Sequence, residues 1–306
     1  MSAAQLTRGA QALPRRPMLR PALAADRAAR LAYARAVARL AVRSLHEELC
    51  LYPKPGLVSL VDTGSHDDMD AATFMRSLFS LRHYFKKICL AGWDDASFAQ
   101  LKQLGIAAEA AMLKATRGIN THRGAIFSLG MLCATAGRAR AQGTPMTPAA
   151  LRAAMLIRWG EELAIHAAPP VAPLSNGLLV AARYAASGAR EEGALGLPSV
   201  FEIGVPALLA SRARGASMTH ARIDTLFALM AHISDSNVYH RAGPQGAQTV
   251  REHARRFIDL GGTAHAGWHA AALESHRVFV QQRLSPGGAA DLLAASCLMH
   301  AIAALE

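Results

Sequence analysis

The sequence predicts an all-α fold, a multi-helix globular array. Of its 306 residues, 52% are hydrophobic but only 6% are aromatic, and Ala and Leu supply much of the apolar share. Ala and Leu favour helices, whereas strands favour Val, Ile, Thr and aromatic residues. Apolar residues also recur at helical spacing, as at Phe74, Leu78, Leu81 and Phe85. We find no credible strand and no internal repeat.

The predicted helices share this apolar period and end at Gly, Pro or polar breaks. They cover residues 26–51, 71–92, 95–118, 125–143 and 148–168, a stretch after Gly177, then 200–212, 219–234, 247–260 and two helices on either side of 285–288. Ser285 is expected to cap the last helix and Pro286 to begin it. Residues 188–198 are predicted to form a loop or short turn, and 234–246 a loop.

The chain is expected to consist of a flexible Arg-rich extension, residues 1–25, and a single all-α domain, residues 26–306. An Arg-rich tail can also resemble a mitochondrial transit peptide, but termini are usually flexible. The tail lacks a signal-peptide core, and no uncharged apolar run is long enough to span a membrane. We therefore expect a soluble, cytoplasmic protein without membrane association.

The four cysteines form no CxxC pair, and each lies in an apolar stretch: Cys50, Cys89, Cys133 and Cys297. This spacing fits neither a zinc site nor a secreted disulfide framework. It indicates reduced, buried thiols.

The formal net charge of +11 favours anionic partners, either nucleic acid or small polyphosphates. Much of the surplus lies in the extension, and aromatic stacking groups are scarce. We therefore expect no nucleic-acid partner.

Polar residues gather in four interhelical segments, 52–70, 118–124, 235–246 and 285–291. In a helical array such loops can converge on one pocket. Within the first, residues 65–70 (SHDDMD) hold three carboxylates and a histidine. Mg²⁺ prefers carboxylate oxygens, although a solvated acidic loop that caps the next helix would have the same composition.

Three further acids are candidates for function. Asp235 is expected at the C-terminal end of a helix, where the dipole disfavours an anion, so either Arg241, a metal or water must stabilise it. Glu109 lies in an Ala-, Met- and Leu-rich helix, and Glu48 ends its helix. If their faces are buried, each glutamate needs a partner or a function.

Two helix starts suit anion binding. Asn120 and Thr121 are expected to cap the helix that follows them, where its first-turn amides with His122 and Arg123 form a phosphate cradle. The SPGGAAD segment offers a second helix N-terminus, and its two glycines allow close backbone approach. Lys54 would place a point charge on a proline-stiffened loop.

Five blocks resemble the successive motifs of the triphosphoribosyl-dephospho-CoA synthase family, in order and over roughly residues 45–300. They are YPKPGLVSLVDTGSHDDMD, AAEAAMLKATRGINTHRGAIFSLGML, SGAREEGALGLPSV, MAHISDSNVYHRAG and RLSPGGAADLLAA. Three positions depart from the family pattern. PKPGLVS replaces PKPGLVD, which leaves Asp62 as a substitute acid; SNG at 175–177 replaces THG; and Arg123 replaces Lys, with different hydrogen-bond geometry.

The resemblance implies an enzyme that converts ATP and 3′-dephospho-CoA into 2′-(5″-triphosphoribosyl)-3′-dephospho-CoA and adenine. The family supplies the prosthetic group of citrate lyase or malonate decarboxylase, and this sequence is more similar to the malonate branch. The product would pass to a carrier-protein transferase. The sequence allows a homodimer.

The resemblance, set beside the residues above, implies three groups of site residues. The catalytic group is Asp70, Glu109 and Glu48. The Mg²⁺ ligands are Asp68, Asp70 and Asp235. The substrate-binding group is Lys54, His66, Asn120, Thr121, His122, Arg123, Asn237, Arg241, Gly287 and Gly288.

Two alternatives remain open at the level of the sequence. Another helical Mg²⁺ enzyme, such as a prenyl-diphosphate synthase or an ADP-ribosyl hydrolase, would also combine helices with acidic loops. A basic, helical nucleic-acid-binding protein would explain the charge.

Overall fold

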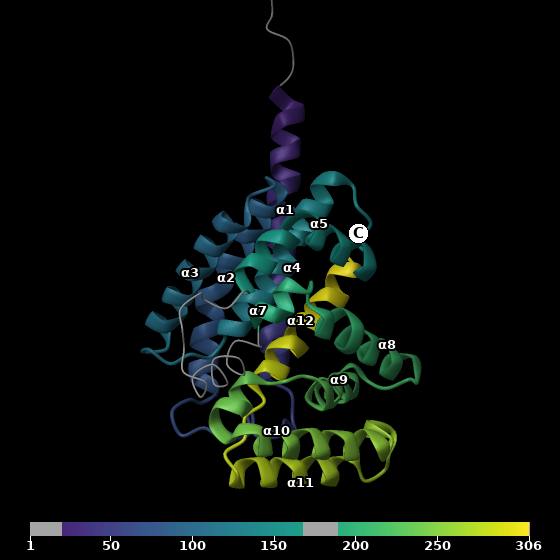
Figure 1. Cartoon of the computed structure of the whole chain (residues 1–306). Helices are drawn as coiled ribbons and strands as arrows, with labels where there is room; N and C mark the ends of the chain where they lie inside the picture. Colours follow the sequence, from purple (N-terminus) through teal and green to yellow (C-terminus); the bar gives the residue numbers. More distant parts are fainter. Residues whose placement is uncertain (1–19, 168–188, 306) are drawn as a thin grey trace, which may run out of the picture.

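The computed structural model describes residues 20–167 and 189–305 (Figure 1). Within these ranges it contains eleven α-helices and no strand, which confirms the all-α prediction. The helices are α1 (Arg20–Leu49), α2 (Ala71–Trp93), α3 (Phe98–Ala115), α4 (Arg123–Gln142), α5 (Pro148–Ala167), α7 (Ala189–Ala194), α8 (Val205–Ala213), α9 (Met218–His232), α10 (Ser236–Asp259), α11 (Trp268–Gln281) and α12 (Gly287–Ala303). The predicted roles of residues 1–19 and of SNG at 175–177 lie outside the described residues.

The N-terminal half is built around α2, which packs against α1, α3 and α4. The predicted apolar face of α2 is buried at Leu78, Leu81 and Phe85. Gly92 brings α2 close to α4, because a Cβ atom there would overlap the carbonyl group of Ala134. Small residues therefore set the distance between these helices.

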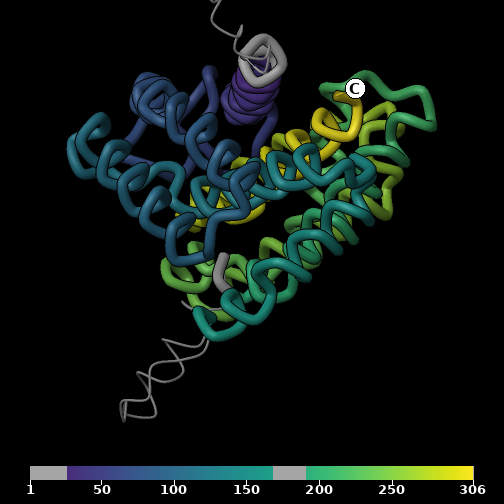
Figure 2. The backbone as a smooth tube through the Cα atoms, turned by 90° about the horizontal axis from the view of Figure 1, so that it is seen from above, coloured from purple at the N-terminus to yellow at the C-terminus, as the bar shows by residue number. Residues whose placement is uncertain are grey.

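α12 is the central helix of the fold. It contacts α1, α4 and α9, and Figure 2 shows it between the N-terminal and C-terminal helices. Leu293, Ala294, Ala295 and Leu298 have no exposed surface. A helix that is apolar on all sides is expected at such a position.

Two predicted loops contain helices. Residues 236–242 belong to α10, whose non-helical residue is Gly243 (φ 61°, ψ −161°), followed by Pro244. Gly tolerates that backbone conformation and Pro restricts the residue before it, so the pair divides α10 into two helical segments at a kink. Likewise, the predicted turn at 188–198 contains α7, and a π-helical turn, Ser199–Gly204, leads directly into α8.

Two predicted helix starts also differ. α1 begins at Arg20, within the predicted extension. α12 begins at Gly287 with Pro286 as its N-cap and without a side-chain capping bond, so the prediction that Ser285 caps this helix was wrong. None of the helices in the described ranges combines the length and the apolar character that a membrane span requires.

Candidate active site

The four polar segments meet where α1 ends and where α4, α10 and α12 begin. Direct contacts connect them: His66 with Ser285, Arg241 with Ser65, and Asp235 with Ala289. Asp291 in α12 also accepts a hydrogen bond from a backbone N–H of α4. Residues far apart in the sequence thus form one polar centre inside a largely apolar protein.

A buried ion pair forms the floor of this centre. Lys54 Nζ lies 2.5 Å from Glu48 Oε1, and the two side chains are only 1% and 5% exposed. Lys54 was predicted as a point charge on a proline-stiffened loop, and the structure adds that its ammonium group is neutralised by the glutamate that ends α1. Glu48, in turn, has the partner that its burial requires.

Asp235 lies at a helix N-terminus, not at the unfavourable helix end that the sequence indicated. Its carboxylate accepts from the backbone N–H of Asn237 in α10 (2.9 Å) and of Ala289 in α12 (3.0 Å). Burial nevertheless raises its pKa, against these hydrogen bonds. The predicted clash with the dipole of α9 was wrong because the chain turns at Ile233 and α10 starts at once.

The glycines of SPGG allow this approach. A Cβ atom on Gly288 would lie 2.9 Å from Asp235 Oδ2, and one on Gly287 would lie 3.0 Å from Asn237 Nδ2. The sequence predicted that these glycines allow a close approach of the backbone. The group that approaches Gly288 is the carboxylate of Asp235.

Asp291 completes a set of three acids. It accepts a hydrogen bond from the backbone N–H of Ala125, and a Cβ atom on Gly124 would overlap its carboxylate. The N-cap residue of α4, His122, makes no side-chain capping bond, and Asp291 caps the first turn of this helix from α12. Desolvation, followed by the charges of Glu48 and Asp235, raises the pKa of Asp291 well above its usual range. Such a carboxyl group is a candidate acid or base.

His122 is oriented by a short hydroxyl chain. Thr121 donates to Ser77 Oγ (2.6 Å), which lies 2.6 Å from His122 Nδ1, and we assign the Ser77 hydroxyl as the donor of this second bond. Burial, with a smaller contribution from Lys54, lowers the pKa of His122 to about 3, and the ring is therefore neutral. Its proton then lies on Nε2, which is buried and has no partner among the described residues. A buried donor of this kind is suited to a ligand or an ordered water.

His66 is held by α10 and by the loop that precedes α12. Arg241 of α10 donates to His66 Nδ1 (3.1 Å) and to the Ser65 carbonyl (3.1 Å). Because Nδ1 accepts, Nε2 carries the proton and donates to Ser285 Oγ at 2.7 Å. Burial, and then the Arg241 charge, lower the pKa of His66.

Other predicted site residues lie at the rim. Arg123 pairs with Glu109 at 2.6 Å, and both side chains are partly exposed. Of the two predicted caps of α4, Asn120 accepts from the backbone N–H of Arg123, the first residue of the helix, whereas Thr121 is bonded to Ser77. His122 is the N-cap itself.

The predicted metal ligands are not arranged as a metal site. Asp70 is the N-cap of α2, and its carboxylate accepts from the backbone N–H and hydroxyl of Thr73, which lowers its pKa. Asp68 is 61% exposed. The Asp235 carboxylate already accepts hydrogen bonds from the first turns of α10 and α12. Among the described residues, no three His, Cys, Asp or Glu side chains could hold a metal ion together. Mg²⁺ therefore stays a prediction.

Two important residues were absent from the predicted site. Asp291 is the single acid in the apolar segment from Ala289 to Met299, and an isolated acid in such a helix is a usable signal. Ser77 gives no comparable signal, because serine in an amphipathic helix is common. Its role arises only from the packing of α2 against the start of α4.

The comparisons with known proteins identify the family. The model of the ATP:dephospho-CoA triphosphoribosyl transferase family matches residues 34–306. The chain belongs to this family. It is therefore a transferase, and the matched region includes every residue of the polar centre.

Curated relatives agree over most of their length. An Acinetobacter calcoaceticus protein named as a probable 2-(5″-triphosphoribosyl)-3′-dephosphocoenzyme-A synthase is 39% identical over 260 residues, which are 85% of this chain and 88% of the relative. A protein of the same name from Vibrio cholerae is 36% identical over 281 residues, 89% of each chain. No solved structure matches this chain significantly.

Proposed function

We propose that this chain transfers the triphosphoribosyl group of ATP to the 2′-hydroxyl of 3′-dephospho-CoA. The bond between the ribose C1′ of ATP and adenine breaks, and a bond between C1′ and the 2′-oxygen forms. The hydroxyl proton passes to a protein base, and adenine leaves with a proton on nitrogen. The triphosphate stays intact.

One observation carries this proposal. The region that matches the family also folds the four polar segments into one centre with three acids, Glu48, Asp235 and Asp291. A glycosyl transfer passes through a ribosyl cation, which carboxylates stabilise, and it needs a base for the attacking hydroxyl.

Asp291 fits the role of base better than the predicted catalytic residues do. Its raised pKa makes its carboxylate a stronger base than an ordinary aspartate. Glu48 is neutralised by Lys54, the Asp70 carboxylate caps α2, and Glu109 pairs with Arg123 at the rim. These three acids would position the site without accepting the proton.

The substrate phosphates would bind at the donor-rich side of the centre. His122 Nε2 is a buried donor without a partner among the described residues. Arg123 and Arg241 are exposed, and their guanidinium groups could turn from their present partners to phosphate oxygens. Mg²⁺ enters the proposal only as a counter-ion that accompanies ATP.

The biological context is part of the same proposal. Ser59 of PKPGLVS is buried and accepts from the backbone N–H groups of Val61 and Asp62, while Asp62 lies 3.5 Å from His276. We propose that this serine, which stands where the citrate branch has Asp, indicates the malonate decarboxylase branch. The product would then pass to a carrier-protein transferase. Four free cysteines support a cytoplasmic location, although only Cys89, Cys133 and Cys297 are buried as expected and Cys50 is exposed. The gene neighbourhood would test the branch.

The reaction is tested by incubating the purified protein with ATP and 3′-dephospho-CoA and measuring adenine by chromatography. We expect adenine and the triphosphoribosyl product in equal amounts. Asp291→Asn should lower the rate by roughly a hundredfold or more, whereas Asp67→Asn, at an 88% exposed side chain, should not. Adenine release without dephospho-CoA would instead indicate a hydrolase.

A further inference from the structure

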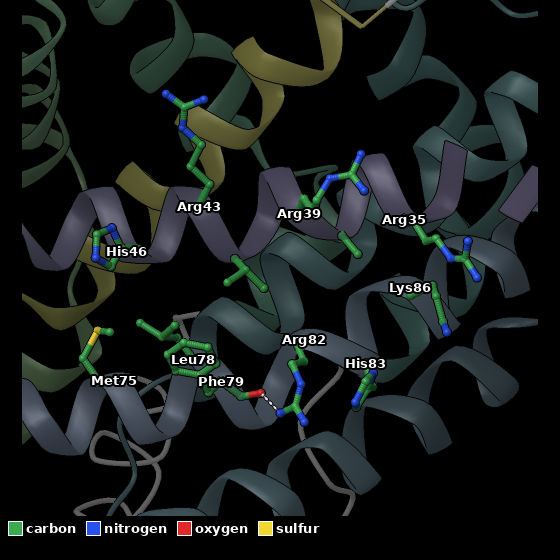
Figure 3. A pocket seen from close by; sticks show the side chains of 12 residues that line it. Arg35, Arg39, Arg43, His46, Met75, Leu78, Phe79, Arg82, His83 and Lys86 are labelled. Carbon is green, nitrogen blue, oxygen red and sulfur yellow. Dashed lines mark hydrogen bonds between the residues drawn. The ribbon is translucent and has the colours of Figure 1, made fainter. Parts of the chain in front are cut away.

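A basic groove lies between α1 and α2 and shares no residue with the candidate active site (Figure 3). Its volume is about 630 Å³. Five cationic side chains line it: Arg35, Arg39, Arg43, Arg82 and Lys86. Among the described residues, no acidic side chain lines it.

The cations follow the groove in a regular row. Arg35, Arg39 and Arg43 are spaced by one helical turn, so they lie along one stripe of α1. Arg43 pairs with Glu47, but Arg35 and Arg39 have no ion-pair partner in the described parts of the chain. From residue 35 to residue 46 this edge is about 17 Å long. The row is therefore extended, with unneutralised charge.

The floor of the groove is apolar. Phe79 is 53% exposed in the middle of α2, and Val42 and Met75 are partly buried beside it. The core beneath is already closed by Leu78, which is only 2% exposed. Phe79 thus contributes little to the core, and an exposed aromatic ring among arginines is typical of an interaction surface.

The geometry distinguishes between two anionic ligands. In Figure 3, Arg39 and Arg43 extend from α1 on the side away from α2, which leaves the apolar side chains between the helices. A bound phosphate needs donors that converge on one point. An amphipathic helix instead needs an apolar groove with charges along its edges. The groove has the second arrangement.

The chain itself does not supply a complementary segment. Residues 1–19 and 168–188 contain arginines and no Asp or Glu. A second copy is also unsuitable, because two arginine-lined grooves would repel each other and the net charge is +11. An acidic segment from another protein is the complementary occupant.

We propose that the groove between α1 and α2 docks an acidic amphipathic helix of a partner protein. Leucine-type side chains of that helix would contact Phe79, Met75 and Val42. Its Asp and Glu side chains would pair with Arg39 and Arg43 on one edge and with Arg82 on the other. This inference does not depend on the proposed reaction.

The test uses a fluorescent, Leu- and Glu-rich peptide of about 14 residues, with the leucines on one helical face. A peptide of the same composition with scattered leucines is the peptide control. Binding to the full chain is measured by anisotropy. We expect the amphipathic peptide to bind better, and Arg39→Glu/Arg43→Glu or Phe79→Ser to weaken it by roughly tenfold or more.

Arg255→Glu/Arg256→Glu is the matched control, because these arginines are exposed on α10 away from the groove. It should leave peptide binding unchanged, and the groove variants should retain normal helicity and adenine release. The proposal is overturned if both peptides bind equally, if neither binds, or if the α10 variant weakens binding as much. It is also overturned if ATP displaces the peptide and the groove variants lose affinity for ATP, since the groove would then bind small polyanions.

Discussion

The carboxylate of Asp235 accepts a 3.0 Å hydrogen bond from the backbone N–H of Ala289, and so joins the first turns of α10 and α12 through one buried side chain. The same carboxylate caps α10 through Asn237. Gly288 leaves just enough room for it. A single acid thus sets the relative position of two segments of the active centre.

Removing that carboxylate should destabilise the fold. Asp235→Ala leaves two backbone N–H groups without their acceptor, which we expect to lower the free energy of unfolding by about 2–4 kcal/mol. Asp235→Asn should cost less, because its amide oxygen still accepts one of the two hydrogen bonds and no charge is buried. Urea denaturation at neutral pH measures both. Equal losses for the Ala and Asn variants would contradict this account.

The Glu48–Lys54 pair should behave as a coupled unit. Lys54→Met leaves Glu48 as an uncompensated buried charge, and we expect a loss of about 3–5 kcal/mol in unfolding free energy. Adding Glu48→Gln should recover much of that loss. A double-mutant cycle from denaturation curves measures the coupling. The partly exposed Arg123–Glu109 pair provides the control cycle, with a coupling of about 1 kcal/mol or less.

The sequence predicted the helices well where packing and local signals agree. The face of α2 with Leu78, Leu81 and Phe85 has a clear helical period, and the structure buries it. The start of α10 was missed because Gly243 and Pro244 suggested a loop. Gly243 does interrupt the helical conformation, but the residues before it form a helical segment of their own, whose Val238 is buried in the core.

The sequence predicted which segments form the active centre, but it did not predict which side chains contact one another there. His66 and Arg241 were both proposed as site residues, yet their direct contact depends on how the loop before α2 packs on α10. Similarly, the capping of α4 by Asp291 joins residues more than a hundred positions apart, and no local pattern reports it. How deeply each of these side chains is buried, and which group it contacts, depends on how the helices pack together, so the sequence alone does not predict it.

His122 should be neutral with its proton on Nε2 throughout the physiological pH range. Its pKa of about 3 follows mainly from burial, and the assigned hydrogen bond from the Ser77 hydroxyl makes Nδ1 the acceptor. Imidazole ¹⁵N chemical shifts between pH 5 and pH 8 measure this directly, with His122→Gln for assignment. Ser77→Ala should mix the two tautomers and reduce activity. A titration of His122 near pH 6.5 in the unmodified protein would contradict the assignment.

Asp291 should make the stability of the protein fall as pH rises. Its pKa is raised in the folded state, whereas an unfolded aspartate titrates near about 3.9. Above that value the unfolded chain releases its proton first, so unfolding becomes easier until the folded group also ionises. Asp291→Asn cannot ionise, and its stability relative to the unmodified protein should therefore increase with pH. Denaturation midpoints at pH 5 and pH 8 measure this difference, and Asp67→Asn should show none. A relative stability of Asp291→Asn that is the same at both pH values would show that Asp291 is ionised as an ordinary carboxylate and would remove the basis for its assignment as the base.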